Sequence, residues 1–493
     1  MQTGILIAVI AYELLIVLGV GLWLARQDAS HKARKGEFAL AARSLPVSVV
    51  AVTLALTVLG TAHILGVFEM AWYLGASAVW FSIAHVVLLV LVCFATGRWV
   101  RRLGVTTVPE ILERLFGQEV RLIVSCVMAG IIFGILTLET QGLGIIISAM
   151  TGWEVANGAV VGGVIGVLYV IIAGLKEVGW INLINAVVMY IGLVLATIFL
   201  AYKLPGASYD SVADFYDGQD QGFMLSIFGT PEIMLTFALG TTVAVVFSQS
   251  VNQMLMQAAM AAKSENTIKK ALWVAAPVNG LFGVFAVVIG LTAKSLPEFQ
   301  ALGPKVAATT MLVTLLPGWL SALVLASFLA AILSTFAMTC LSPATILAND
   351  IYKRLYKPQA TEADVTRVTR LMIITLAVIA MAVAAFLPPI LAAINWLFSW
   401  LVPVFWLLTF GLLWRRHAGV AIATLVAAWG VNCAWSFTDL PTLVGLEGTP
   451  NAYMTLAATL LVYVVGHLMW PGKPGLFREE GGTAANDLAE EGV

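Results

Sequence analysis

Long apolar runs separated by short polar segments fill the chain from its start to about residue 470. A run of about 20 apolar residues has the length that crosses the hydrocarbon core of a bilayer as a helix. Thirteen such runs are bounded by charged or turn-forming residues, at 3–25, 46–71, 76–98, 120–150, 155–173, 180–202, 232–256, 271–293, 317–345, 365–386, 390–414, 418–437 and 450–470. The pattern predicts an all-α polytopic membrane protein with 13 transmembrane helices.

The composition agrees with this class. Of 493 residues, 60% are apolar and 11% charged, whereas a soluble domain has about 45–50% apolar and about 25% charged residues. A soluble enzyme is therefore excluded, and a net charge of −1 gives no sign of a nucleic-acid partner. The four cysteines lie in apolar runs without metal-ligand spacing, so we expect buried thiols.

The charges of the connecting segments predict the orientation. Lys and Arg gather at 26–43, 98–121, 176, 263–270, 353–370, 415–416 and 473–478. The segments between these are nearly free of cations or are acidic, notably at Asp210, Asp214, Asp217 and Asp220. Because basic loops stay on the cytoplasmic side, we expect a multi-pass plasma-membrane protein whose N-terminus is outside and whose C-terminus is cytoplasmic.

Two spans carry polar interruptions. The second contains Leu59-Gly60-Thr61-Ala62-His63, where a break would expose the carbonyls of Leu56 and Leu59 and place His63 at a cavity. Alternatively, Gly60 permits close packing and His63 bonds a neighbouring helix. The seventh span contains Gly240-Thr241-Thr242 and the polar stretch 248–253. Interruptions five spans apart predict an inverted-repeat transporter with its site near the midplane.

The ninth span offers oxygen ligands. Ser334 and Thr335 follow the Ala331 carbonyl by about one helical turn, and together they supply three oxygens for a hard cation such as Na⁺. Hydroxyls in membrane helices also bond back to the carbonyl four residues earlier. The residues by themselves leave both interpretations open.

Several short segments, taken in order, resemble motifs of the sodium/solute symporter family, which includes sodium/proline, sodium/glucose and sodium/sialic acid transporters. The segments are FALAARSLP at 38–46, TVPE at 107–110, AGLKEV at 173–178, AAKS at 261–264 and DIYKR at 350–354. The resemblance covers nearly the whole chain.

The resemblance implies a LeuT-like fold, a five-plus-five inverted repeat with one extra N-terminal and two extra C-terminal helices. It divides the chain into a first helix with a basic inner loop (1–45), a first repeat (46–204), an acidic outer loop (205–231), a second repeat (232–416), two C-terminal helices (417–470) and a disordered cytoplasmic tail (471–493).

The family's shared sodium site falls on the backbone carbonyls of Leu56, Leu59 and Ala331 and the hydroxyls of Ser334 and Thr335. The resemblance thus implies Na⁺ as the coupling ion. A second sodium site is not expected.

Three departures from the family pattern bear on that expectation. Asn182 stands where members often carry an aspartate, and Ala337 and Met338 stand where members with a second sodium site have hydroxyls. We therefore predict one Na⁺ per cycle. Val58 occupies a position that is acidic or amide in some relatives, which puts the sodium release route in doubt.

The regions that bind substrate in the family offer nine candidate side chains: His63, Glu69, His85, Glu139, Gln141, Gln249, Asn252, Trp396 and Ser399. A protonated His63 beside helix N-termini would favour a carboxylate, and an ionised Glu69 or Glu139 an amine. We expect a small monocarboxylate or amino acid. Alternative roles are a solvated outer mouth for Glu139, the inner end of the seventh span for Asn252 and core packing for Trp396.

The predicted function is a sodium-coupled secondary active symporter that imports a small organic solute by alternating access. Its expected partners are the solute and the bilayer, with no obligate protein partner evident. Proton coupling through His63 or Glu139 is one rival, and a transporter-like sensor subunit is another. A membrane enzyme is the weakest option, because no HExxH, GxSxG or paired-carboxylate arrangement stands out.

Overall fold

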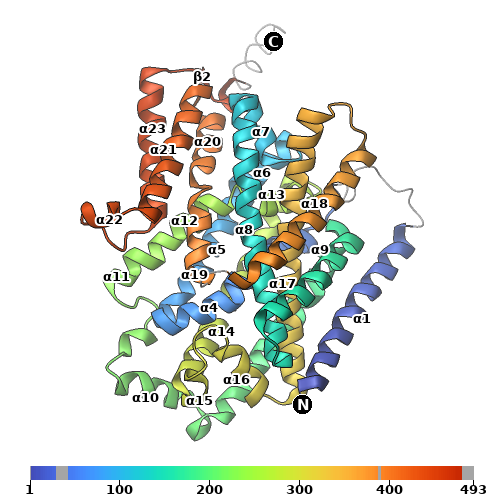
Figure 1. The fold of residues 1–493 in the computed structure, drawn as a ribbon, viewed down its shortest axis with the longest axis vertical. Coiled ribbons are helices and arrows are strands. Elements are labelled where there is room, and N and C mark those ends of the chain that lie inside the picture. Colours follow the sequence, from blue (N-terminus) through green and yellow to red (C-terminus); the bar gives the residue numbers. More distant parts are fainter. Residues whose placement is uncertain (1, 29–42, 387–389, 480–493) are drawn as a thin grey trace, which may run out of the picture.

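The computed structural model describes residues 2–28, 43–386 and 390–479. The chain forms a bundle of helices along the long axis of the molecule, with α17 and α8 near the middle and the pair α21 and α23 at one side (Figure 1). Helix α1 begins at one end of the bundle, and strand β2 lies at the other. Most of the resemblance motif at 38–46 lies outside the described residues, which include only 43–46 of it.

The first half of the chain contains α1 (Gln2–Asp28), α3 (Val47–Thr57), α4 (Thr61–Leu74), η2 (Gly75–Val79), α5 (Trp80–Leu91), η3 (Val92–Thr96), α6 (Gly97–Leu103), α7 (Val108–Phe116), α8 (Gln118–Thr151), α9 (Val155–Lys203), η4 (Pro205–Ala207), α10 (Asp210–Gly218) and η5 (Gly222–Leu225).

The second half contains α11 (Pro231–Ile233), η6 (Met234–Leu239), α12 (Gly240–Gln249), α13 (Gln253–Met260), α14 (Glu265–Ser295), α15 (Pro297–Gln300), α16 (Ala307–Leu315), α17 (Gly318–Ile346), η7 (Leu347–Tyr356), α18 (Glu362–Val383), η8 (Ala384–Phe386), α19 (Ile390–Ser399), α20 (Val402–Leu413), β1 (Arg415–Arg416), α21 (Ala418–Phe437), α22 (Leu440–Leu443), α23 (Asn451–Met469) and β2 (Lys473–Pro474).

Helices cover every predicted apolar run. Within the described residues, ten helices are long and apolar enough to cross a membrane, and three shorter apolar helices span 4–20, 47–57 and 155–171. The predicted runs 155–173 and 180–202 both belong to α9, which is helical throughout its 49 residues. The all-helical membrane class is therefore confirmed, while the number of crossings remains a prediction.

Helix α17 forms the centre of the bundle. The most apolar stretch of this helix is 94% buried inside the bundle. The helix packs against α1, α3, α8, α9, α13 and α18. A helix that is apolar on all sides is stable when other helices surround it. Any polar side chain on α17 therefore faces protein or a cavity.

Two of the predicted interruptions are real breaks. Helix α3 ends at Thr57 and α4 begins at Thr61, with Gly60 in extended conformation between them. Helix α12 ends at Gln249 and α13 begins at Gln253. Within the interrupted seventh span, residues 240–242 continue the helix that begins before them, so the break falls in the polar stretch 248–253.

A third break, between α19 and α20, was missed by the sequence reasoning. The two helices are separated at Trp400 and Leu401, and Pro403 stands in the first turn of α20. Proline lacks a backbone N–H and fits the first turn of a helix. Pro403 was therefore the residue in the sequence that could have indicated this break.

The expectation of a disordered tail over 471–493 is wrong for its first residues. Strand β2 pairs antiparallel with β1, so that Lys473 lies opposite Arg416. The Gly475 N–H also donates to the Trp414 carbonyl at 2.9 Å. These backbone bonds hold the segment against the end of α20. Residues 480–493 lie outside the described part.

The family-like motifs meet in pairs at the basic end of the bundle. Leu45 of the first motif exchanges backbone hydrogen bonds with Ala261 and Lys263 of the AAKS motif, each at 3.2 Å. The Thr107 hydroxyl of the TVPE motif donates to Asp350 of the DIYKR motif at 3.0 Å. The motifs therefore join helix ends that lie far apart in the sequence.

Asp350 belongs to a network of ions that joins α7, α8 and η7. Arg121 Nε donates to Asp350 Oδ1 at 2.7 Å, and Arg121 and Arg354 both pair with Glu113. Burial opposes ionisation of Glu113, but the hydrogen bonds and charges of the two arginines outweigh it and lower the pKa of this carboxyl. The fully buried Asp350 carboxylate depends on Arg121 for charge compensation.

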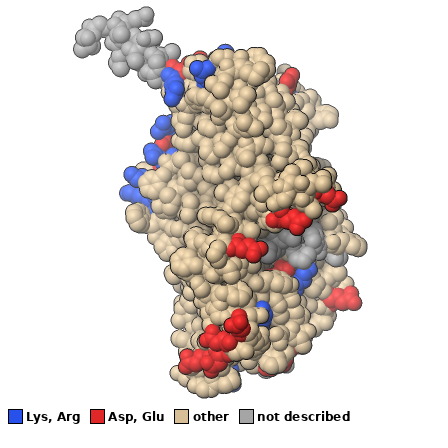
Figure 2. Space-filling model, turned by 90° about the vertical axis from the view of Figure 1, so that its left-hand side faces the viewer, with Lys and Arg blue, Asp and Glu red and all other residues tan. Residues whose placement is uncertain are grey.

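The charges separate along the long axis. On the face shown in Figure 2, Lys and Arg gather mostly toward the upper end, and Asp and Glu mostly toward the lower part. The acidic residues Asp210, Asp214 and Asp217 belong to α10, which lies at the end opposite β2 (Figure 1). This separation follows the alternation of basic and acidic segments in the sequence.

We predict that the substitution Asp350→Ala destabilises the protein by about 3–5 kcal/mol, because it removes one partner of a buried ion pair and leaves Arg121 undercompensated. Denaturant unfolding in detergent measures the effect. Lys357→Ala is the control, since its ion pair with Asp364 is solvent-exposed and its loss should change stability little. Equal effects of the two substitutions would contradict the prediction.

Candidate functional site

The break between α3 and α4 faces α17. The Thr335 hydroxyl on α17 donates to the Leu56 carbonyl at 3.0 Å and lies 3.3 Å from the Ala331 carbonyl. Leu56, Ala331 and Thr335 are at most 2% exposed. Three of the five oxygens expected to bind Na⁺ are thus brought together from two helices.

The other two expected oxygens belong to the same elements. Leu59 lies in the non-helical segment between α3 and α4. The Ser334 hydroxyl is fully buried and has no hydrogen-bond partner among the described residues. An unpartnered buried hydroxyl costs free energy, and a cation would supply the missing interaction. Neutral oxygens of this kind suit a hard cation such as Na⁺.

Glu139 of α8 caps the broken helix. Its Oε2 accepts hydrogen bonds from the Thr61 backbone N–H at 2.8 Å and the Thr61 hydroxyl at 2.9 Å. A Cβ at Gly60 would lie 2.5 Å from Glu139 Oε1, so glycine permits this approach. A carboxylate at a helix N-terminus is stabilised by the helix dipole. The alternative of a solvated outer mouth is wrong, since Glu139 is 2% exposed.

His63 is held by protein groups on both ring nitrogens. Nδ1 lies 3.0 Å from the Val58 carbonyl in the break, and Nε2 lies 2.9 Å from the Ser82 hydroxyl on α5. Because a carbonyl only accepts, Nδ1 carries a proton in this contact. The ring also packs edge-on against His85 with centroids 4.5 Å apart. The helix is therefore broken, and His63 bonds a neighbouring helix as the alternative interpretation held. The expectation that the break places His63 at a cavity is not supported, because His63 is fully buried and is not among the residues that line the cavity beside the break.

A small central cavity lies beside the break. Its volume of about 20 Å³ is close to what one water molecule needs, so the centre is closed in this conformation. The lining residues are Thr57, Val58, Gly60, Ala62, Phe81, His85, Ile135, Glu139, Gln249, Met254, Thr335, Ile394 and Phe398. His85, Glu139 and Gln249 are thus the expected substrate residues that the structure brings together here.

Trp396 and Ser399 line a different cavity of about 310 Å³, together with Thr236, Thr241 and the segment 448–452. Ile394 and Phe398 of the same helix, α19, line the central cavity instead. Helix α19 is therefore the partition between the two cavities. Trp396 also packs edge-on against Trp400 with centroids 5.6 Å apart, in agreement with the packing alternative.

The remaining expected residues line neither of these two cavities. Asn252 caps α13 by accepting from the Met254 N–H at 3.1 Å, and it donates to Gln249 Oε1 at 3.2 Å. It therefore orients the Gln249 side chain. Glu69 on α4 and Gln141 on α8 are buried within the bundle.

Sequence reasoning missed three contributors to this centre. Ser82 bonds His63, and Phe81 and Phe398 form apolar walls. Ser82 precedes His85 by three residues, so the two share a helix face. That spacing could have identified Ser82, whereas no sequence pattern distinguishes Phe81 or Phe398 from ordinary core residues.

The residues at which the chain departs from the family pattern are buried. Ala337 and Met338 are at most 2% exposed and bring no hydroxyl to α17. Asn182 on α9 is fully buried, and its amide has no hydrogen-bond partner among the described residues.

Comparisons with known proteins find sodium-coupled transporters among the proteins that this chain resembles. The chain is 25% identical over 423 residues to a sodium/glucose cotransporter of Vibrio parahaemolyticus, covering 80% of this chain and 76% of that protein. It is 24% identical over 277 residues to a sodium-coupled monocarboxylate transporter of Bos taurus, covering 54% and 43%. A solved structure of a substrate-bound, outward-open Na⁺-coupled sialic acid symporter superposes with a TM-score of 0.79 at 16% identity, covering 95% of this chain and 98% of that one.

The match to a family model shows to which protein family the chain belongs. The model of the sodium:solute symporter family matches residues 38–427, which is most of the chain. Na⁺ as the coupling ion, expected from the residues around Leu56 and Thr335, agrees with this match. The chain belongs to the sodium:solute symporter family.

Proposed function

We propose that this protein imports a small organic solute together with one Na⁺ per cycle by alternating access. The observation that carries the proposal is the contact between the Thr335 hydroxyl of α17 and the Leu56 carbonyl at the break of α3. An ion bound there touches two helices at once, so it binds best to the conformation that holds them together. Such differential binding is what couples an ion gradient to a conformational change.

The transport core is proposed to consist of two five-helix repeats, 46–204 and 232–416, within a protein of 13 crossings. The breaks after Thr57 and after Gln249 support this division, because they occur in the leading helix of each repeat. The helix before the first repeat and the two helices after the second repeat are additions to the core. The basic end is assigned to the cytoplasm of the plasma membrane, with the N-terminus outside.

The proposed solute is a monocarboxylate or amino acid, and the central cavity favours the amino acid. Glu139 already occupies the N-terminus of α4, so the dipole of that helix is compensated and the remaining carboxylate oxygen suits an amine. The amide of Gln249 can accept or donate. Phe81 and Phe398 offer apolar walls for a small side chain.

Proton coupling through the same fold is the second candidate. Its supporting observation is the buried Glu139 carboxylate beside the expected ion site, since ionisable groups inside membranes serve as proton carriers. His63 is a poorer carrier, because both of its ring nitrogens are bonded to protein groups.

We predict that Thr335→Val weakens Na⁺ binding by about tenfold or more. The substitution removes one of the oxygen atoms proposed to bind the ion, while it keeps the volume of the side chain. The measurement is the rise of Tm with NaCl, compared with choline chloride. Thr339→Val is the matched control, since Thr339 lies one turn further on α17 and bonds only to carbonyls of its own helix. If both variants respond to Na⁺ alike, the ion binds elsewhere.

A panel of monocarboxylates, amino acids, amines, sugars and nucleobases should identify the solute class. A ligand at 100 times its Kd stabilises the folded state by about 2.7 kcal/mol. We expect a rise in Tm for a small amino acid in sodium buffer and none in choline buffer. A shift that is independent of sodium but varies with pH would support proton coupling instead.

Glu139→Ala should destabilise the protein by about 1–3 kcal/mol, because the Thr61 N–H and hydroxyl lose their buried acceptor. Glu139→Gln keeps one acceptor oxygen and should cost less. Denaturant unfolding in detergent compares the free energies of unfolding of the two variants. An unchanged stability of Glu139→Ala would refute the capping role, and sodium-driven uptake that survives in Glu139→Gln would argue against Glu139 as a proton carrier.

A further inference from the structure

Three elements at the basic end of the bundle, α7, α8 and η7, are tied to one another by ion pairs. Glu113 of α7 pairs with both Arg121 of α8 and Arg354 of η7. Arg121 also pairs with the buried Asp350 of η7. Such pairs resist separation, because a buried charge that loses its partner is left uncompensated. These elements therefore form one unit, which we call the α7 unit.

A second unit lies beside the first and contains the start of α3, α6 and α13. Arg101 of α6 donates to the carbonyl of Ala262, just beyond the end of α13, at 2.8 Å. Leu45, two residues before α3, exchanges backbone hydrogen bonds with Ala261 and Lys263 at 3.2 Å each. Helices α6 and α13 pack against each other (Figure 1). We call these elements the α13 unit.

Two buried glutamines of α13 connect the α13 unit to the α7 unit. Gln253 Oε1 accepts from the Val108 N–H, at the start of α7, at 2.8 Å, and Gln253 Nε2 donates to the Thr106 carbonyl at 3.1 Å. Gln257 lies one turn further along the same face of α13. Its Oε1 accepts from the hydroxyl of Ser342, at 3.0 Å, on α17, which continues directly into η7. Both glutamine side chains are fully buried.

Helix α13 runs from the central cavity to the basic end. Met254, the residue after Gln253, lines the cavity beside the break, and Ala262 beyond the other end of α13 takes part in the contacts of the basic end. The break between Gln249 and Gln253 separates α13 from α12. Helix α13 is therefore the part of the seventh span that separates the central cavity from the basic side.

The hydrogen bonds of Gln253 favour the closed arrangement of the two units. In this arrangement Val108 is fully buried, so without the glutamine its N–H would have no partner and would cost free energy. When the two units separate, water reaches the same groups and replaces the lost bonds. Removal of the glutamine amide therefore raises the free energy of the closed arrangement alone.

We propose that Gln253 and Gln257 are positioning residues that hold the basic side of the central cavity closed. They release α7 and α17 when that side opens and the solute leaves toward the cytoplasm. This role rests on the proposed function, since it requires alternating access. The amide of Gln253 makes two bonds across the contact and that of Gln257 makes one, so Gln253 has the larger effect.

Alkylation of an engineered cysteine tests the proposal without knowledge of the solute. Met254→Cys is introduced into the full-length protein after the four native cysteines are replaced by alanine, and N-ethylmaleimide is added to the detergent-purified protein. Gln253→Ala should raise the alkylation rate at position 254 about tenfold, which corresponds to about 1.4 kcal/mol. Gln257→Ala should raise this rate as well, but by a smaller factor.

Arg114→Ala is the matched control for Gln253→Ala. Arg114 of α7 also bridges to α6, through the Leu103 carbonyl at 3.0 Å, but this bond is exposed to solvent. Water replaces an exposed bond in either arrangement, so Arg114→Ala should leave the alkylation rate at position 254 unchanged. A rate that rises as much in Arg114→Ala as in Gln253→Ala would contradict a specific role of the buried amides.

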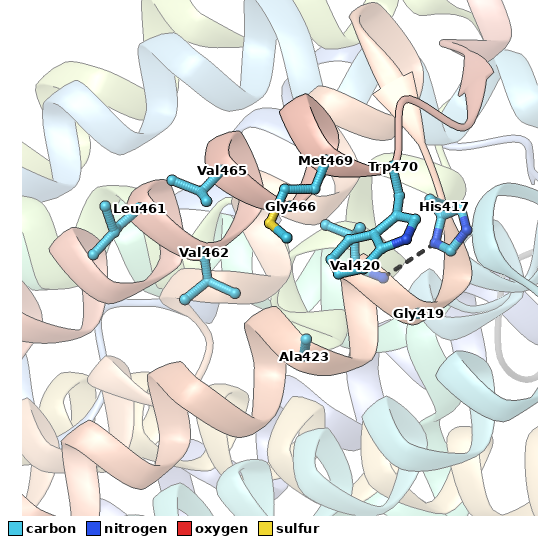
Figure 3. A pocket seen from close by; sticks show the side chains of 10 residues that line it. All are labelled: His417, Gly419, Val420, Ala423, Leu461, Val462, Val465, Gly466, Met469 and Trp470. Atoms are coloured by element: carbon cyan, nitrogen blue, oxygen red, sulfur yellow. Dashed lines mark hydrogen bonds between the residues drawn. The ribbon is translucent and has the colours of Figure 1, made fainter.

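Two further cysteine positions provide reference rates. Ala423→Cys gives the rate of an accessible thiol, because Ala423 is exposed in the open apolar groove of about 690 Å³ between α21 and α23 (Figure 3). Thr241→Cys reports general loosening of the bundle, because Thr241 is 3% exposed on α12, on the other side of the break. Gln253→Ala should change neither of these rates.

An equal rise at Thr241→Cys would show that Gln253 only stabilises the bundle, and it would overturn the proposal. Unchanged alkylation at position 254 in both Gln253→Ala and Gln257→Ala would overturn it too. NaCl should slow alkylation at position 254 in Gln253→Ala, compared with choline chloride, because the proposed ion holds α3 against α17. A tenfold rise that NaCl does not reduce would support the role of the glutamines and contradict the proposed sodium coupling.

Discussion

The centre of this protein depends on how the backbone between α3 and α4 is satisfied away from water. Three side chains from three helices perform this task. Thr335 of α17 donates to the Leu56 carbonyl, His63 of α4 bonds the Val58 carbonyl, and Glu139 of α8 accepts from the Thr61 N–H. Without such partners a broken helix inside a membrane would be strongly disfavoured. The break is therefore stable only as part of the assembled bundle.

The same arrangement explains why the break suits transport. Its partners come from different helices, so the proposed alternating access would require an ion or solute to take over some of their bonds. Thr335 and Glu139 both line the small central cavity, so a ligand there competes directly with the contacts that hold the break. Helix α19 divides this cavity from the one lined by Trp396, because its residues Ile394 and Phe398 line the first and Trp396 and Ser399 line the second.

The basic end of the bundle is fixed by contacts between distant segments. Leu45 pairs with the AAKS motif, Thr107 bonds Asp350, and Arg121 compensates the buried Asp350 charge. These polar contacts lie at helix ends, where backbone groups have no intrahelical partner. They explain why short motifs far apart in the sequence lie together.

The sequence by itself determined the membrane class, and it indicated the breaks at Gly60 and after Gln249. These follow from local signals: apolar length, a glycine within one span and a polar stretch within another. The oxygens proposed to bind Na⁺ around Leu56 and Thr335 came from the resemblance to the family, because the residues alone left their role open. Only the tertiary structure decided that Glu139 caps α4, that Ser82 bonds His63 and that Trp396 belongs to a separate cavity. Each depends on which helices become neighbours, and packing between distant segments decides that, because an apolar helix in a membrane can bury several of its faces equally well.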